Sequence, residues 1–333
     1  MNQVRPIYSN VTTYKGLREW RDNSLQSFIH NHQKLNKFHD ELMYQVAKLA
    51  IEKVESEWGP APTHFAFFVM GSAARYEQSV WSDQDHGIIY EEESEEASTY
   101  FLKLGKELTT GLAIAGYEQC DGKVMASNPL WCKSIQEWKK QIMGWIEEED
   151  WESIRYLLTF FDSKVFVGKE ANLLELKQII FNKVDESPYL LKRMFDNVGR
   201  IRKVIGLFGQ LFVETRGEQT GKIDLKNAAF FPYVNMIRLL AIKEQISQPS
   251  TLERLQYLPS QYQKIKSYET DFVKLLAYRL RFQAGKENYE DVHFLDIRQL
   301  TKAEKKELKR MVKNGHNIYK DTKRIIEKGC SRW

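Results

Sequence analysis

Two aspartates separated by a single residue are the part of this sequence best suited to chemistry. Asp83 and Asp85 are expected at alternate positions of one strand, which continues into the apolar residues over 86–91. In an extended chain, residues i and i+2 project from the same face, so the two carboxylates can converge on one cation. Mg²⁺ is a hard cation that prefers oxygen ligands. The spacing therefore predicts a site for Mg²⁺, or for Mn²⁺, held by Asp83 and Asp85.

A Gly-Ser pair precedes these aspartates and follows an apolar segment that is expected to be a strand over 64–70. In such a turn, Gly71 and Ser72 are suited to place backbone N–H groups and a hydroxyl against a phosphate. Arg75 follows closely, and its planar guanidinium can bind two phosphate oxygens at once, with Glu77 orienting it. A phosphate-binding turn beside a metal pair is what the transfer of a nucleotidyl group requires.

Each part of this pattern also has an ordinary interpretation. A Ser-Asp-x-Asp run alone is usually a turn with solvated carboxylates, and a Gly-Ser pair alone is only a turn. The ordered combination of apolar strand, Gly-Ser, Arg, Glu and Asp-x-Asp is more specific than any of its parts. His86 follows Asp85 and is expected on the opposite face, in a structural role.

The surrounding sequence predicts the elements that must hold these residues in place. Apolar residues at spacings of three and four predict helices from about residue 17 to 58. The elements expected next are strands over 64–70, 86–91 and 117–120, a strand leading into a turn over 122–129, and helices over 94–115, 135–146 and 151–161. From Phe195 onward the pattern is almost wholly helical. We therefore expect an α+β fold with an N-terminal helical segment (1–60), a small mixed-sheet nucleotidyltransferase domain (61–165) and a C-terminal α-helical bundle (166–333).

Composition narrows the class of protein and its partners. The net charge of +4 over 333 residues is mild and does not favour a nucleic-acid partner, although it leaves room for a local basic face. The lysine-rich stretch over 302–328 is most simply a solvated helical face, with a nucleic-acid patch as the less favoured alternative. The three cysteines include no CxxC pair, which favours free thiols in a reducing compartment. No secretory signal is visible and the longest apolar runs are too short to cross a membrane, so we expect a soluble cytoplasmic protein.

The motif resembles the signature of the DNA polymerase β-like nucleotidyltransferase superfamily, in which Gly-Ser is followed by Asp-x-Asp. It is more closely similar to a nucleotidyltransferase family akin to PII uridylyltransferase and glutamine synthetase adenylyltransferase. The positions that match are Gly71, Ser72, Arg75, Glu77, Gln78, Asp83, Gln84 and Asp85. Further similarity lies in the block over 120–131, in the Phe-Phe-Asp segment over 160–162 and in the helical residues after 223.

The resemblance implies transfer of a nucleoside monophosphate from ATP or UTP to a hydroxyl, with release of pyrophosphate. It also implies a substrate-binding-like helical domain and an acceptor on a protein, such as a tyrosine of a signalling protein. Members of the superfamily normally supply a third carboxylate, for which Asp121 and Glu77 are the candidates here, so the general base is left open. The alternative is a catalytically inactive nucleotide-binding regulatory module; a small-molecule or RNA acceptor is a weaker one.

In the helical half, Lys226 or Arg238 could contact the nucleotide phosphate or the acceptor. The competing interpretation is a buried structural ion pair, and the sequence favours neither. The nucleotide, the acceptor and the oligomeric state are not specified by any residue pattern.

Overall fold

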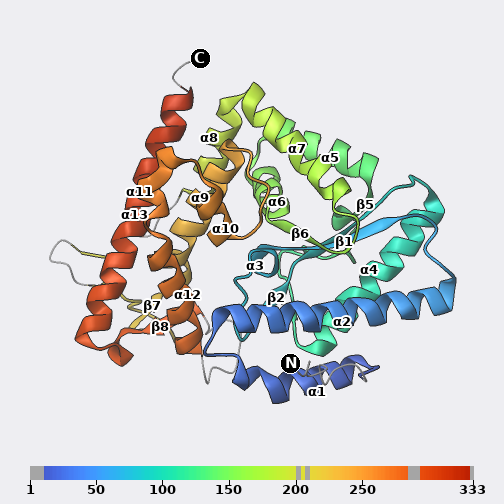
Figure 1. Ribbon diagram of the computed structural model, residues 1–333, viewed down its shortest axis with the longest axis horizontal. Helices are drawn as coiled ribbons and strands as arrows, with labels where there is room; N and C mark the ends of the chain where they lie inside the picture. Colours follow the sequence, from blue (N-terminus) through green and yellow to red (C-terminus); the bar gives the residue numbers. More distant parts are fainter. Residues whose placement is uncertain (1–10, 200–203, 207–210, 284–292, 331–333) are drawn as a thin grey trace, which may run out of the picture. The chain divides into compact units, whose positions relative to one another are not determined.

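The structure is a computed structural model that describes residues 11–199, 204–206, 211–283 and 293–330. The chain divides into two compact units. The first unit comprises Met1–Gln141 and Ser163–Glu175, and the second comprises Ile142–Asp162 and Leu176–Trp333. Figure 1 labels the elements of both units along the chain.

A four-stranded mixed sheet forms the centre of the first unit. Its strands are β1 (Phe65–Met70), β3 (His86–Tyr90), β5 (Cys132–Ser134) and β6 (Ser163–Gly168), in the order β5-β3-β1-β6. Strand β1 is antiparallel to β3 and to β6, whereas β3 and β5 are parallel. Two short strands, β2 (Asp83–Gln84) and β4 (Glu118–Gln119), form a separate parallel pair. This small mixed sheet among many helices confirms the expected α+β class.

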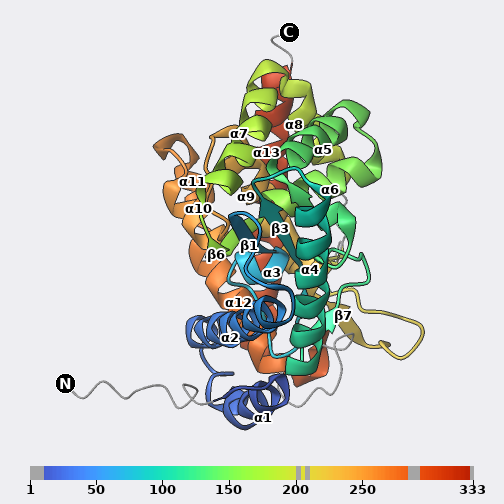
Figure 2. The same ribbon diagram turned by 90° about the vertical axis from the view of Figure 1, so that its right-hand side faces the viewer.

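Helices from both sides of the motif pack on this sheet (Figures 1 and 2). They are α2 (His32–Trp58), α3 (Gly71–Ala74) and α4 (Glu95–Ala115). Helix α1 (Tyr14–Ser24), which is followed by a 3₁₀ turn over Leu25–Ser27, packs on α2 and α4 instead. On one face, the Phe101 ring of α4 lies 4.8 Å from that of Tyr90 and 5.1 Å from that of Phe65. On the other face, Trp138 of α5 (Ile135–Glu148) packs on Phe68, and its indole N–H donates to the Ile88 carbonyl. The sheet core is therefore apolar on both faces.

Two expectations about strands are wrong in detail. The segment over 122–129 is a loop rather than a strand, and the 3₁₀ turn η3 (Pro129–Trp131) follows it. The Asn128 side chain caps that turn by accepting a hydrogen bond from the Leu130 N–H, and proline offers no ladder donor. The aspartates do not share one strand either, because β2 ends at Gln84 and β3 begins at His86.

The second unit is almost entirely helical. Its helices are α6 (Trp151–Phe161), α7 (Ala171–Glu186, whose first residues belong to the first unit), α8 (Pro188–Val198), α9 (Phe231–Lys243), α10 (Thr251–Tyr257), α11 (Gln263–Lys266), α12 (Glu269–Gln283) and α13 (Lys302–Cys330). A π-helical turn, η4 (Lys226–Phe230), precedes α9, and 3₁₀ turns cover Ser260–Tyr262 and Ile297–Gln299. Two short strands, β7 (Lys222–Asp224) and β8 (Phe294–Asp296), pair antiparallel. Among the described residues, no helix combines the length and apolar character that membrane crossing requires.

Candidate active site

The two motif aspartates lie beside the Gly-Ser turn. The Met70 N–H at the end of β1 donates to the Asp85 carbonyl at 2.8 Å, which joins the end of one strand to the start of the next. A Cβ atom added to Gly71 would lie 2.4 Å from Oδ2 of Asp85. Gly71 also has φ of +57°, a left-handed conformation that glycine adopts without steric cost. Only glycine therefore allows the Asp85 carboxylate to lie directly against this turn.

A thiol joins the two carboxylates. In the parallel pair, Asp83 lies opposite Glu118 and Gln84 opposite Gln119, so continuation of this register brings Asp85 level with Cys120. One carboxylate oxygen from each aspartate and the Cys120 sulfur all lie within 4.8 Å of one another, and all three residues are half-buried. Among the described residues, this is the group whose types and spacing could hold a metal ion.

The Cys120 thiol is protonated in this setting. Burial, followed by the charge of Asp85 and a hydrogen bond to it, raises the pKa of Cys120 to about 12. A thiol with such a pKa is a poor nucleophile, because the thiolate is the reactive form. Cys120 therefore acts in the absence of a metal as a hydrogen-bond donor to Asp85. The sequence alone indicated only a free thiol at this position.

The residues that alternate with the aspartates point inward and hold the strand. Gln84 is fully buried; its Nε2 donates to the carbonyls of Thr109 and Tyr117, and its Oε1 accepts from Nε2 of His86 at 2.9 Å. The second ring nitrogen of His86 accepts a hydrogen bond from the Ala126 N–H. Burial lowers the pKa of His86 to about 3, so the ring is neutral. The expected structural role of His86 is confirmed.

The N-terminal helices hold the irregular segment over 77–82 that leads from the turn to the aspartates. Asn36 of α2 accepts from the Gln78 N–H and donates to the Gln78 carbonyl. His39 of α2 lies 3.0 Å from the Ser79 carbonyl, and Arg21 of α1 donates to that of Val80. These bonds satisfy backbone groups that lack partners in a helix or sheet. Sequence analysis missed all three side chains, which act through tertiary contacts alone.

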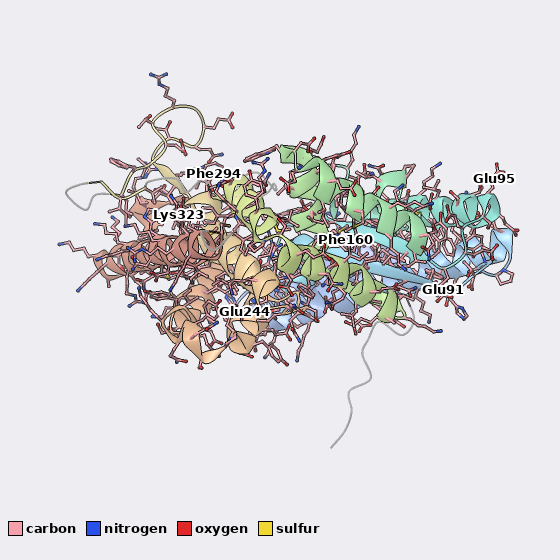
Figure 3. The ribbon with its side chains drawn as sticks, turned by 90° about the horizontal axis from the view of Figure 1, so that it is seen from above. Glu91, Glu95, Phe160, Glu244, Phe294 and Lys323 are labelled. Atoms are coloured by element: carbon pink, nitrogen blue, oxygen red, sulfur yellow. The ribbon has the colours of Figure 1, made fainter. Side chains whose placement is uncertain are left out.

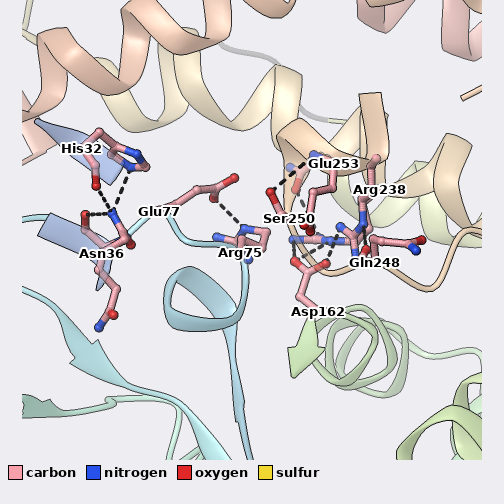
Figure 4. Close-up of polar contacts among 12 residues, drawn as sticks. His32, Asn36, Arg75, Glu77, Asp162, Arg238, Gln248, Ser250 and Glu253 are labelled. Carbon is pink, nitrogen blue, oxygen red and sulfur yellow. Dashed lines mark hydrogen bonds and ion pairs between the residues drawn. The ribbon is translucent and has the colours of Figure 1, made fainter. Parts of the chain in front are cut away.

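The remaining motif residues lie near the turn but outside the group of three. Arg75 and Glu77 are buried and form an ion pair, with Nε of Arg75 2.6 Å from the Glu77 carboxylate (Figure 4). Ser72 is half-buried, and its carbonyl accepts from the Glu77 N–H. Asp121 is exposed. The geometry thus gives Glu77 the partner Arg75, and it brings neither Glu77 nor Asp121 within the distance at which Cys120 lies.

In the second unit, the residues suggested for phosphate contact have separate environments. Arg238 donates from Nε and Nη2 to the Asp162 carboxylate, whose other oxygen accepts from Arg254 (Figure 4). Asp162 and Arg254 are fully buried, and Arg238 is nearly so. The structural ion pair is therefore present at Arg238. Lys226 opens η4, with its Nζ 3.3 Å from Nε2 of His293.

The donor set fits a divalent cation. Two carboxylates are the usual protein contribution to a Mg²⁺ site, where water and substrate phosphates supply the remaining ligands. Mn²⁺ accepts the same oxygen ligands, whereas a thiol suits softer metals. The two aspartates can therefore hold Mg²⁺ or Mn²⁺, and such an ion would supply positive charge to phosphate oxygens.

Comparison with protein families covers most of the chain. Residues 17–152 match the family described as "Putative nucleotidyltransferase DUF294". Residues 188–325 match the family described as "Putative nucleotidyltransferase substrate binding domain". No curated protein matches the chain. The chain therefore belongs to this nucleotidyltransferase family and combines its nucleotidyltransferase domain with its C-terminal substrate-binding domain.

Proposed function

We propose that this nucleotidyltransferase uses Mg²⁺ or Mn²⁺ held by Asp83 and Asp85 to transfer a nucleoside monophosphate from ATP or UTP to a hydroxyl on a protein, with release of pyrophosphate. The observation that carries the proposal is the position of the aspartate pair, in which Asp85 lies directly against the Gly71 turn. Asp83 and Asp85 would hold the ion beside this turn, where it would supply positive charge to the oxygens of the triphosphate.

Each motif residue has a distinct part in this proposal. The Ser72 hydroxyl and the turn amides bind the triphosphate, as polar groups of a tight turn suit anions. Glu77 fixes the guanidinium of Arg75 through their buried ion pair, so that Arg75 orients the phosphates without searching many rotamers. Cys120 donates a hydrogen bond to Asp85 and holds that carboxylate in place. Lys226 is a proposed nucleotide contact from the second domain.

Among the described residues, no third carboxylate joins the aspartate pair. The Glu77 carboxylate is paired with Arg75, and Asp121 is exposed. This arrangement favours a second candidate function, a nucleotide-binding regulatory module without transfer activity. The two candidates differ in whether pyrophosphate is released.

A labelling experiment separates them. The protein is incubated with Mg²⁺, a cell lysate and each nucleoside triphosphate labelled with ³²P at the α- or the γ-phosphate. We expect a protein band that retains the α-label and never the γ-label, because only the nucleoside monophosphate is transferred. Nucleotide binding without labelled protein or pyrophosphate identifies the regulatory module instead. Transfer of the γ-label contradicts both candidates.

Substitutions test whether protein labelling depends on the Asp83 and Asp85 site. Asp83→Asn with Asp85→Asn is expected to reduce labelling by at least about a hundredfold, since several kcal/mol of charge stabilisation depend on the metal. Glu92→Gln with Glu96→Gln removes two exposed carboxylates of the same domain and is the matched control. Asp121→Asn tests the remaining candidate for the third carboxylate: a loss as large as that of the aspartate pair assigns the role to Asp121.

A further inference from the structure

The positive charge of the chain is concentrated in its last helix. Over Lys302–Cys330, α13 has ten Lys and Arg against four Asp and Glu, a net charge of +6. The whole chain has 49 against 45, so the remainder, with 39 against 41, is slightly acidic. The mild net charge of the chain therefore conceals one strongly basic element.

Five lysines of α13 form a single stripe along its length. We call Lys302, Lys306, Lys309, Lys313 and Lys320 the lysine stripe. At 100° per residue they fall within roughly 60° of arc, and at 1.5 Å per residue they span about 27 Å. Lys309 is half-buried and the other four are exposed. None of the five forms an ion pair with a carboxylate of the described residues.

Three of the four carboxylates of α13 pair with neighbouring helices, and the fourth, Glu327, pairs with Lys323 of α13 itself. Glu304 pairs with Arg281 and Glu307 with Lys274, both on α12, whereas Asp321 pairs with Lys264 of α11 at 2.7 Å. These three contacts use acidic groups of α13 to attach it to neighbouring helices. Because these carboxylates are paired with other helices, they do not neutralise the lysine stripe.

Packing fixes the rotation of α13, so the lysine stripe has a defined direction. Gly315 lies against Tyr233 and Pro232 of α9, where a Cβ would come within 3.1 Å of the Tyr233 ring. The Tyr233 hydroxyl donates to the Met311 carbonyl, and Asn314 donates to the buried Asp271 of α12. The packed face and the lysine stripe are on opposite sides of the helix. Figure 3 shows nitrogen-tipped side chains around Lys323 on α13.

We propose that the lysine stripe binds the phosphate backbone of a nucleic acid, independently of base sequence. A straight row of about 27 Å has the length of some eight base pairs of a duplex, measured along its axis at about 3.4 Å each, so it can reach phosphates on both sides of a groove. Lysines act on phosphates as point charges and need no bidentate geometry. The site belongs to the second unit, and its binding requires neither nucleotide nor metal.

A protein or a membrane fits this surface less well. Protein interfaces are depleted in lysine and centred on aromatic or other apolar side chains, and no large apolar side chain of α13 is exposed among its described residues. Membrane-surface helices bury an apolar face in the lipid, but the apolar face of α13 is packed within the second unit. A row of phosphate charges therefore suits the lysine stripe better than a protein or a membrane does.

The test measures fluorescence anisotropy of labelled 20-base-pair DNA, 20-base-pair RNA and single-stranded RNA of mixed sequence, without nucleotide or divalent metal. Five phosphate contacts predict a slope of about −4.5 for log K against log salt, or a loss of roughly 500-fold in affinity between 50 and 200 mM KCl. The three probes distinguish which nucleic acid is bound. Polyglutamate and phosphatidylserine vesicles are tested in parallel.

Two variants of the stripe and one control locate the binding. Charge reversal at four positions (Lys306→Glu, Lys309→Glu, Lys313→Glu and Lys320→Glu) is expected to weaken binding at least tenfold and to reduce the salt slope by about 3.6. The same four lysines changed to Gln provide the milder variant, should charge reversal disturb folding by circular dichroism. The control reverses four exposed lysines of the first unit (Lys15, Lys34, Lys106 and Lys169). No binding at 50 mM KCl, an equal loss in the control, or tighter binding of polyglutamate or vesicles would each overturn the proposal.

Discussion

The two units use buried polar groups differently, although each contains a buried ion pair. In the first unit, neutral side chains such as Asn36, Gln84 and His86 satisfy the backbone around the motif, so that the acidic pair stays half-buried at the edge of the sheet. In the second unit, a charged group, Asp162, lies fully buried between two arginines. Because neutral side chains hold the backbone around the motif, the carboxylates of Asp83 and Asp85 stay available to a cation. In the second unit, the charge of Asp162 is instead used to hold helices together.

Removal of the buried charge in the second unit is expected to have the largest effect on stability. Asp162→Asn leaves Arg238 and Arg254 without their carboxylate, and loss of one partner of a buried ion pair costs about 3–5 kcal/mol. Urea unfolding followed by circular dichroism measures the change. Asp196→Asn, which removes an exposed partner of Lys192, is the control and should change the unfolding midpoint little. Equal effects of the two substitutions would show that Asp162 is not a structural centre.

Acid is expected to destabilise the first unit through its buried neutral histidines. Burial lowers the pKa of both His39 and His86 to about 3, whereas an unfolded histidine titrates near 6.5. Below pH 6.5 both histidines are therefore protonated in the unfolded chain but stay neutral in the folded chain. The free energy of unfolding consequently falls as the pH falls. Each histidine should cost about 2 kcal/mol between pH 7 and pH 5. Urea unfolding at the two pH values tests this, and His86→Gln should flatten the dependence; an unchanged dependence contradicts the assignment.

A single methyl group at the turn should disturb the metal pair more than the fold. Gly71→Ala meets a positive φ, at a cost of about 1–2 kcal/mol, and its Cβ displaces the Asp85 carboxylate. We expect Mn²⁺ affinity to fall about tenfold. Gly144→Ala is the matched control, since its Cβ meets no atom within 4 Å, and alanine in α5 should stabilise the helix slightly. Isothermal titration with Mn²⁺ measures the affinity of both variants. Equal affinities would show that Asp85 does not hold the metal.

The aspartate pair could be predicted from the sequence, because the direction of alternate side chains in an extended segment depends only on neighbouring residues. Asp83 and Asp85 point away from the interior, and Gln84 and His86 point into it, although the chain leaves one strand and enters another between them. The same reasoning predicted β1, the long helices and the mixed sheet. These features follow from apolar periods of two and of three to four residues.

Features that depend on distant contacts could not be predicted. Cys120 reaches Asp85 because β2 pairs with β4, and two-residue strands give no signal of their pairing. The apolar residues Val124 and Ala126 suggested a strand, but their backbone groups bond instead to His86 from within a loop. The roles of Asn36 and His39 arise only when α2 packs beside the motif.

The central claim is that Asp83 and Asp85 together hold a divalent metal, and Mn²⁺ electron paramagnetic resonance tests it most directly. The method counts bound ions without requiring turnover, acceptor or nucleotide identity. We expect one Mn²⁺ site in the unaltered protein, lost in Asp83→Asn with Asp85→Asn and retained in Glu92→Gln with Glu96→Gln. Unchanged Mn²⁺ binding in the double aspartate variant, with its fold intact by circular dichroism, would show that these aspartates do not hold the metal.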